Sequence, residues 1–250
     1  MESFEDQALL LSARPHGEGG AVVTLFTETH GRHAGYVHGG QSQSKRATLS
    51  NGNLVQVEWN AKTSDQLGSY KLDMLQQFSA LIMEDKDKLK MLQSLCALCD
   101  TSLPEREPHP HFFQTTLALL TVMAHSDDPL LVGETYIKWE ITLLAELGFS
   151  LDFTRCAGGG DSNRLAYISP KSGCAVSYEA GEPYKDKLLP LPSFLKPNGG
   201  PSDKEDISKG LDITGTFLEK WAYAQHTKGM PEQRIFLQKD LAERVTVVNN

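Results

Sequence analysis

The sequence predicts an α+β protein in which a small β-barrel precedes an α-helical domain. Short β-branched runs separated by glycine-bearing turns fill residues 6–78, and apolar residues take up helical spacing after Glu84. A stretch rich in glycine and proline, residues 155–200, then interrupts the helices. We therefore expect a barrel domain at 1–80 and a helical domain at 81–250, with 155–200 as an irregular, knuckle-like insertion.

The barrel region divides into five expected strands. They cover Gln7–Arg14, Ala21–Thr29, Arg32–His38, a run from Leu54 to Trp59, and Tyr70–Phe78. Five short strands in a segment of this length fit a closed barrel such as the OB-fold. An SH3-like barrel would give a similar pattern, so both remain open on strand count.

The helices that follow are marked by apolar spacing and by caps. We expect them at Lys88–Cys99, Phe112–Ala124, from Asp128-Pro129 to Leu147-Gly148, around Ile207–Trp221, and after Pro231. Glu134 and Lys138 are spaced as a helical i,i+4 pair. Ser202 and Glu205 have the spacing of a capping box ahead of the fourth helix.

Composition limits the class of protein. The 250 residues carry a net charge of −8, which argues against nucleic-acid binding across the whole surface but allows a local basic patch. No apolar run is long enough to span a bilayer, and the acidic N-terminus lacks the features of a signal peptide. Four cysteines are too few for a disulfide scaffold, so we expect a reducing cytoplasm.

The loop after the third expected strand is basic. Arg32, Lys45 and Arg46 lie in a segment without an acidic residue, where glycines and serines allow close backbone approach and His33 and His38 add partial charge. Such a loop on an OB-fold can follow a nucleic-acid backbone. A solvated, flexible loop is the alternative interpretation.

The cysteines and histidines suggest no catalytic centre. Cys96, Cys99, His109 and His111 form a two-Cys, two-His set on paper, but both cysteines fall on the apolar face of a helix, which favours a role as core residues. A redox pair would need a helix N-terminus to lower the thiol pKa. Catalytic and phosphate-loop motifs are lacking, so we expect no enzyme. The aromatic residues Trp59, Tyr70, Trp139 and Trp221 are interpreted as core, with Trp59 and Tyr70 the candidates for base stacking if they are exposed.

Several stretches, taken in order, resemble the bacterial RecO family of recombination mediators. Residues 8–32 (A-L-L-L-S-A-R-P-H-G-E-G-G-A-V-V-T-L-F-T-E-T-H-G-R) resemble its opening strands, and residues 39–46 (G-G-Q-S-Q-S-K-R) its basic glycine-rich loop. Residues 139–152 (W-E-I-T-L-L-A-E-L-G-F-S-L-D) resemble the helix ahead of its zinc knuckle. Residues 165–177 and 180–192 continue the likeness, which covers most of residues 5–240.

The resemblance implies a DNA-binding protein without covalent chemistry. It would bind single- and double-stranded DNA and anneal complementary strands. With RecR, it would help load RecA onto single-stranded DNA coated by single-strand DNA-binding protein. The protein would be cytoplasmic and associated with the nucleoid. The DNA contacts implied are Arg14, Arg32, His38, Lys45 and Arg46. The C-terminal tail of the single-strand DNA-binding protein would dock on the helical domain, where Lys88, Lys90 and Lys138 are the candidate cations.

The family's zinc ligands map onto Cys156, Gly159, Ser177 and Ala180, so only Cys156 is kept. A tetrahedral zinc site needs four ligands, and we therefore expect no zinc and no other cofactor. Two further hypotheses stay open. The first is a protein-interaction adaptor with weak DNA contact, because the loop carries Gln41, Gln43 and His38 where cations are common. The second is a metal-dependent enzyme that uses Cys96, Cys99, His109 and His111.

Overall fold

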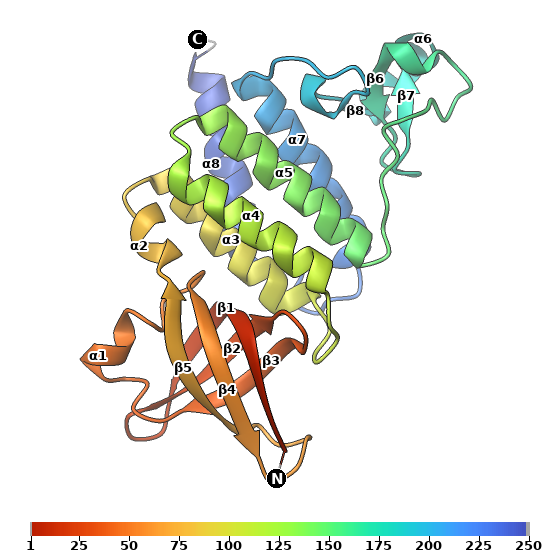
Figure 1. Cartoon of the computed structure of the whole chain (residues 1–250). Helices are drawn as coiled ribbons and strands as arrows, with labels where there is room; N and C mark the ends of the chain where they lie inside the picture. The colour runs from red at the N-terminus through yellow and green to blue at the C-terminus, as the bar shows by residue number, and fades with distance from the viewer. Residues whose placement is uncertain (1, 249–250) are drawn as a thin grey trace. The chain divides into compact units, whose positions relative to one another are not determined.

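The computed structural model describes the backbone of residues 2–248 and the side chains of residues 2–241. Its strands are β1 (Glu2–His16), β2 (Gly20–Thr27), β3 (Gly31–Val37), β4 (Leu54–Ala61), β5 (Ser69–Gln76), β6 (Leu165–Ile168), β7 (Ala175–Ser177) and β8 (Leu189–Pro190). Its α-helices are α1 (Gln43–Arg46), α2 (Phe78–Ile82), α3 (Lys86–Ser102), α4 (Pro110–His125), α5 (Pro129–Glu146), α6 (Tyr178–Gly181), α7 (Lys204–Phe217) and α8 (Glu232–Val248) (Figure 1). Contacts divide the chain into two compact units, residues 1–125 and 126–250.

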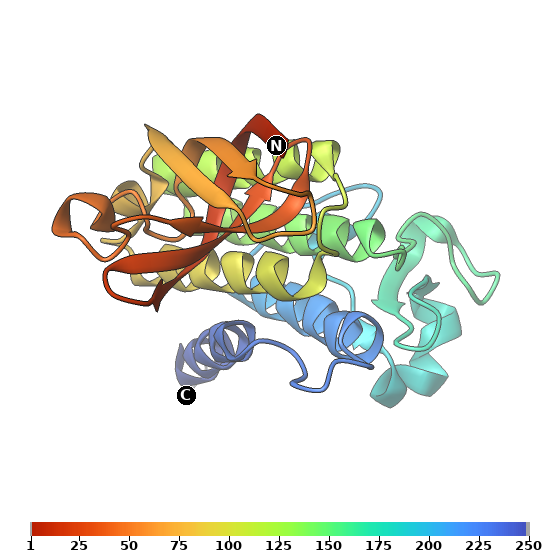
Figure 2. The ribbon, with the colours of Figure 1, turned by 90° about the horizontal axis from the view of Figure 1, so that it is seen from below.

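The first five strands close into a barrel in the order β1-β2-β3-β5-β4 (Figures 1 and 2). All neighbours are antiparallel except β3 and β5, which meet in parallel at Tyr36 and Ser69. This order confirms the OB-fold over the SH3-like alternative. Alternate residues face inward and form one apolar core, in which Trp59 and Tyr70 are 3% and 4% exposed. Both are therefore core aromatics, as the sequence favoured.

Helices α2, α3 and α4 belong to the same compact unit as the barrel. A bulge in β1 between Leu10 and Ser12 leaves Leu11 buried, and α3 contacts β1 and β2. Phe26 of β2 packs against Phe112 and Phe113 of α4, with ring centroids 5.9 Å and 5.4 Å away. The boundary between the two compact units therefore falls after residue 125, not near residue 80 where the strands end, because these helices pack against the barrel.

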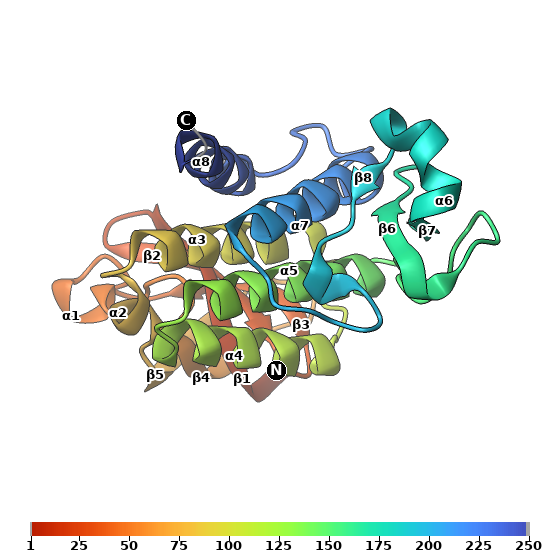
Figure 3. The ribbon, with the colours of Figure 1, turned by 90° about the horizontal axis from the view of Figure 1, so that it is seen from above.

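The second unit is built on α5, α7 and α8, with α7 packed against both of the others (Figure 3). Glu140 of α5 and Arg234 of α8 are fully buried and form a two-pronged ion pair, with Nε–Oε1 at 2.5 Å and Nη2–Oε2 at 2.9 Å. Thr214 of α7 donates its hydroxyl to the same carboxylate. One buried polar centre thus links the three helices.

The insertion expected to be irregular contains a small ordered sheet of order β7-β6-β8, which stands apart at one end of α5 and α7 (Figures 1 and 3). Its strands have only two to four residues, too short for alternation to mark them. Trp221 packs against this insertion: it lies against Gly173, and its ring centroid is 5.8 Å from that of Phe149, with the two planes tilted by 34°. The expectation of irregular structure was therefore wrong for these strands.

The caps test two further expectations. Asp128 caps α5 as predicted, since its carboxylate accepts from the amides of Leu130 at 2.9 Å and Leu131 at 3.4 Å, and Glu134 pairs with Lys138 at 3.2 Å. The capping box was wrong by one residue. Asp203 caps α7 by accepting from the amide of Asp206, while Ser202 donates its hydroxyl to Glu134. Within the described residues, none of the helices has the length and apolar character needed to cross a membrane.

Candidate nucleic-acid interface

The loop between β3 and β4 is organised by its own hydrogen bonds. Gly39 has a φ of +65°, a conformation that suits glycine, and turns the chain away from β3. The amide of Ser42 then donates to the carbonyl of Gly39 at 3.0 Å, and α1 follows with Lys45 and Arg46 in its single turn. Lys45 donates from Nζ to the carbonyl of His38 at 2.8 Å. Lys45 and Arg46 are therefore carried by an exposed helical turn with hydrogen bonds of its own.

Gln41 joins this loop to the turn between β1 and β2. Its side-chain Nε2 donates to the carbonyls of Gly17 at 3.1 Å and Gly20 at 2.9 Å, and its backbone N–H donates to the carbonyl of Gly19 at 3.0 Å. Three hydrogen bonds hold the two loops together, which reduces the entropy lost when a ligand binds across them. Gln41 thus replaces a possible cation with a positioning role, a function that its place in the sequence did not reveal.

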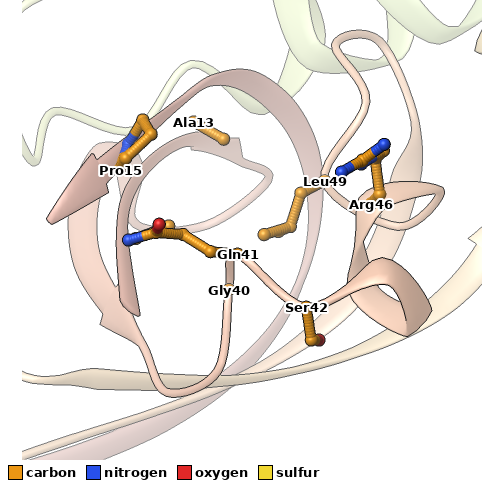
Figure 4. Close-up of a pocket in the computed structure, with 8 residues that line it drawn as sticks. Ala13, Pro15, Gly40, Gln41, Ser42, Arg46 and Leu49 are labelled. Carbon is orange, nitrogen blue, oxygen red and sulfur yellow. The ribbon is translucent and has the colours of Figure 1, made fainter. Parts of the chain in front are cut away.

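An open pocket with a volume of about 340 Å³ lies between the two loops (Figure 4). Ala13, Pro15, Ala21 and Leu49 give it apolar walls, and Gln41, Ser42 and Arg46 give it a polar edge. Figure 4 shows Gln41 reaching toward the strand that carries Pro15, with Arg46 on the opposite side and Leu49 between them. An exposed guanidinium beside a serine hydroxyl is suited to a phosphate group.

The remaining implied DNA contacts separate into two kinds. Arg14 is 78% exposed on β1, with only a long 3.8 Å approach to Asp100, and His38 is exposed at the end of β3. Arg32 is 18% exposed and its charge is already engaged, by the carbonyl of Leu103 at 2.8 Å and by Asp100 and Glu105 at 3.9 Å and 3.4 Å. Arg32 therefore joins the barrel to the α3–α4 loop, and we remove it from the candidate contacts.

The same face of the barrel carries an aromatic group that the sequence interpretation missed. Tyr36 pairs across the sheet with Val22, which pairs with Arg14, so these side chains share the outer face. The Tyr36 ring lies 6.1 Å from the ring of His16 and 4.8 Å from that of His38. Alternation along β3 places Tyr36 outward and His38 follows two residues later, but the approach of His16 depends on the registers of β1–β2 and β2–β3.

The three candidate partner-binding lysines are not gathered on one element. Lys88 and Lys90 are two residues apart on α3, so their side chains leave the helix on different sides. Lys138 lies on α5 in the other compact unit, 53% exposed, with its Nζ 5.5 Å from the centre of the Phe194 ring. The three candidate lysines are therefore divided between the two compact units.

The cysteines have two distinct environments. Cys96 and Cys99 are buried in α3, as the sequence favoured. Burial raises the pKa of the Cys96 thiol to about 12 and holds the pKa of the Cys99 thiol well above its usual value. Cys156 accepts a hydrogen bond from the amide of Ser177 at 3.1 Å. Although partial burial opposes it, the amides of Ser177, Gly160 and Gly158 lower the pKa of Cys156. In the described part of the chain, no three His, Cys, Asp or Glu side chains are grouped so that they could hold a metal ion.

Comparison with known proteins decides the family. The model of the recombination protein O N-terminal domain matches residues 1–78, and that of the recombination protein O C-terminal domain matches residues 83–228. The chain belongs to the RecO family.

Several curated relatives, each named DNA repair protein RecO, extend over nearly the whole chain. The protein of Rhodospirillum centenum is 47% identical over 235 residues, which cover 92% of this chain and 91% of that protein. The protein of Rhodospirillum rubrum is 42% identical, covering 94% of both. The protein of Caulobacter vibrioides strain NA1000 is 41% identical, covering 96% and 98%. The RecO N-terminal match coincides with the barrel, and the C-terminal match begins at residue 83, directly after α2.

Proposed function

We propose that this RecO-family chain acts in DNA repair as a DNA-binding recombination mediator, and that the outer face of its barrel holds the DNA. The observation that carries this proposal is the ordered basic turn at Lys45 and Arg46, fixed to the β1–β2 turn by Gln41. The relatives carry the name DNA repair protein, which agrees with it. The role is one of binding and strand alignment without covalent chemistry.

The physical basis is local neutralisation of phosphates by a protein that is acidic overall. Arg14, Lys45 and Arg46 are exposed around the two loops, while the net charge of the chain is −8. Each phosphate contact releases counterions, so the affinity should fall as salt increases. The acidic remainder of the surface repels DNA, which restricts binding to this face.

Fluorescence anisotropy of labelled single-stranded DNA at several salt concentrations tests the site. Arg46→Ala should weaken binding and reduce the salt slope by about 0.7, the value expected for one lost contact on a single strand. Lys171→Ala is the matched control, because Lys171 is an exposed cation between β6 and β7 and both changes lower the net charge by one. If both variants lose affinity equally, only the net charge matters and the assignment of the loop is wrong.

RecR, RecA loading and the tail of single-strand DNA-binding protein belong to the same proposal. Annealing follows if two complementary strands are held with their bases exposed, and loading of RecA would depend on RecR. An acidic peptide ending in an aromatic residue is expected to bind the helices beside a cation. Lys138, next to Phe194, is the cation we would change first. Lys138→Ala should weaken binding of the acidic peptide and leave the affinity for DNA unchanged.

The adaptor is the second candidate, favoured by the net charge and by the Gln41 hydrogen bonds that replace a cation. It predicts tight binding to RecR or to the acidic peptide with little DNA affinity at physiological salt. Tight, salt-sensitive DNA binding by the isolated chain would exclude it.

We also propose that the knuckle folds without zinc. The Cys156 sulfur accepts a hydrogen bond from the backbone N–H of Ser177, and the Ser177 hydroxyl accepts from the backbone N–H of Ala180 at 3.4 Å. Positions that carry ligands in other members are thus joined by hydrogen bonds. This arrangement supports a structure held by backbone contacts rather than by a metal.

A further inference from the structure

Tyr36, on the outer face of the barrel, packs directly over a glycine of the neighbouring strand. A Cβ built on Gly20 would lie 1.8 Å from the Tyr36 hydroxyl oxygen and 2.2 Å from the ring carbon that bears it. The ring of Tyr36 therefore crosses β2 over Gly20, in space that any other residue would fill. The ring is half-buried and remains part of the surface.

Two imidazoles flank this ring. His16 and His38 are exposed, and their planes make angles of 81° and 83° with the plane of Tyr36. The tyrosine forms a floor and the histidines stand roughly perpendicular to it. A planar ring placed on the floor would stack on Tyr36 and meet the two imidazoles at its edges.

The charges around this cluster suit a nucleic acid strand. Arg14 shares the outer face, and Lys45 donates to the carbonyl of His38, so the basic turn adjoins one imidazole. Two acidic residues lie nearby: Glu18 is exposed in the turn after His16, and Asp100 is 3.8 Å from Arg14. A base on the floor would thus have phosphate-binding groups beside it.

We infer that Tyr36, with His16 and His38, is a stacking site for an unpaired base, and that this site makes the protein prefer single-stranded over double-stranded DNA. The inference rests on the proposed DNA-binding function. Bases in a duplex already stack on their neighbours and cannot lie on the tyrosine, whereas a single strand can place a base there. Phosphate contacts at Arg46 are open to both forms of DNA.

Tyr36 also covers Gly20, a contact that stabilises sheets by itself, so the test must separate stacking from support of the fold. Tyr36→Leu keeps an apolar cover over the glycine but removes the aromatic plane. Tyr36→Phe keeps both. Tyr184→Leu is the matched control, since Tyr184 is a 62% exposed tyrosine outside the barrel.

The experiment compares the affinities of three labelled ligands for each variant of the full chain. The ligands are an unstructured oligothymidine, the same strand with abasic sites at its centre, and a duplex closed by hairpins at both ends. Wild type should bind the thymidine strand more tightly than the abasic one. Tyr36→Leu should lose on the order of 5- to 100-fold for the thymidine strand, and with it the preference over the abasic strand, while duplex affinity stays unchanged.

Tyr36→Phe and Tyr184→Leu should behave as wild type. Equal loss for all three ligands in Tyr36→Leu would mean that the ring only supports the barrel, and no loss would mean that bases do not stack there; either result overturns the inference. Arg46→Ala, measured beside them, should weaken all three ligands. If Arg46→Ala does so and Tyr36→Leu changes nothing, the inference alone fails, whereas a wild type that binds none of the ligands overturns the proposed function as well.

Discussion

Individual arginines show which cations the fold uses and which it presents to a partner. Arg32 and Arg46 come from the same basic segment, yet Arg32 is largely covered and bound to Leu103, Asp100 and Glu105, while Arg46 is exposed beside the pocket. The sequence showed the charges but not the carboxylates opposite Arg32, because those residues lie about seventy positions along the chain.

Arg32→Ala should therefore change stability rather than DNA binding. Removing the guanidinium leaves the Leu103 carbonyl without its donor and should cost about 1–3 kcal/mol of unfolding free energy. Denaturant titration measures this, and anisotropy at a temperature where the variant is folded should give wild-type affinity and salt slope. A slope reduced as far as in Arg46→Ala would return Arg32 to the DNA interface.

His33 predicts a pH dependence of stability. It is buried in the barrel, with its Nδ1 2.8 Å from the Tyr70 hydroxyl, and burial lowers its pKa to about 4. The unfolded state binds a proton near pH 6.5 and the folded state does not, so this stability is fully present above pH 6.5 and is lost as pH falls toward 4. The effect over that range is on the order of 3 kcal/mol.

Chemical denaturation of wild type and His33→Gln at pH 7.5, 6.0 and 5.0 measures this dependence. Wild type should lose stability progressively, and the variant, although less stable at pH 7.5, should lose less over the same range. Parallel pH profiles for the two proteins would show that His33 is not the group responsible.

Secondary structure elements were predicted well where a pattern had room to repeat. The five barrel strands and the helices α3, α4, α5, α7 and α8 all lie where alternation, helical spacing or caps placed them. The turn α1 and the strands β6–β8 have two to four residues each and lie below the length that periodicity can detect. The loop hydrogen bonds of Gln41 were beyond reach for another reason, since they depend on two turns far apart in sequence.

The helices of the second unit depend on their buried ion pair. Arg234→Met should cost about 3–5 kcal/mol of unfolding free energy, because it leaves the Glu140 carboxylate buried without a counter-charge. The double variant Glu140→Leu with Arg234→Met should regain a large part of that stability, since no charge then remains in the interface. Denaturant midpoints decide between this coupling and simple additivity, which would contradict it.

The stability of the knuckle insertion, residues 155–200, is expected not to depend on a metal ion. If hydrogen bonds around Cys156 and Ser177 hold it, a zinc chelator should leave Tm unchanged, because there is no binding free energy to remove. Elemental analysis of the purified protein checks the same point. Zinc near one equivalent, with a Tm that falls on chelation, would contradict this account of the insertion.

For the whole molecule, the fold class followed from the order of patterns, strands first and helices after, and the ordered motifs led to the family. What the sequence did not reveal is that α2–α4 share a compact unit with the barrel, because this depends on outward-facing residues such as Phe26 meeting Phe112 and Phe113. The overall charge of −8 was informative in a limited sense. Under the proposed function, this charge would restrict DNA to a small basic face, and the sequence alone does not show which face that is.

Hydrogen exchange of the backbone amides, measured with and without an unstructured single strand, tests the central claim most directly. On binding, exchange should slow in the β1–β2 turn, at the end of β3 and in the loop that carries α1, with α3 and residues 126–250 little changed. Protection confined to residues 126–250, or none anywhere while DNA is bound, would contradict the claim that the barrel face holds the DNA.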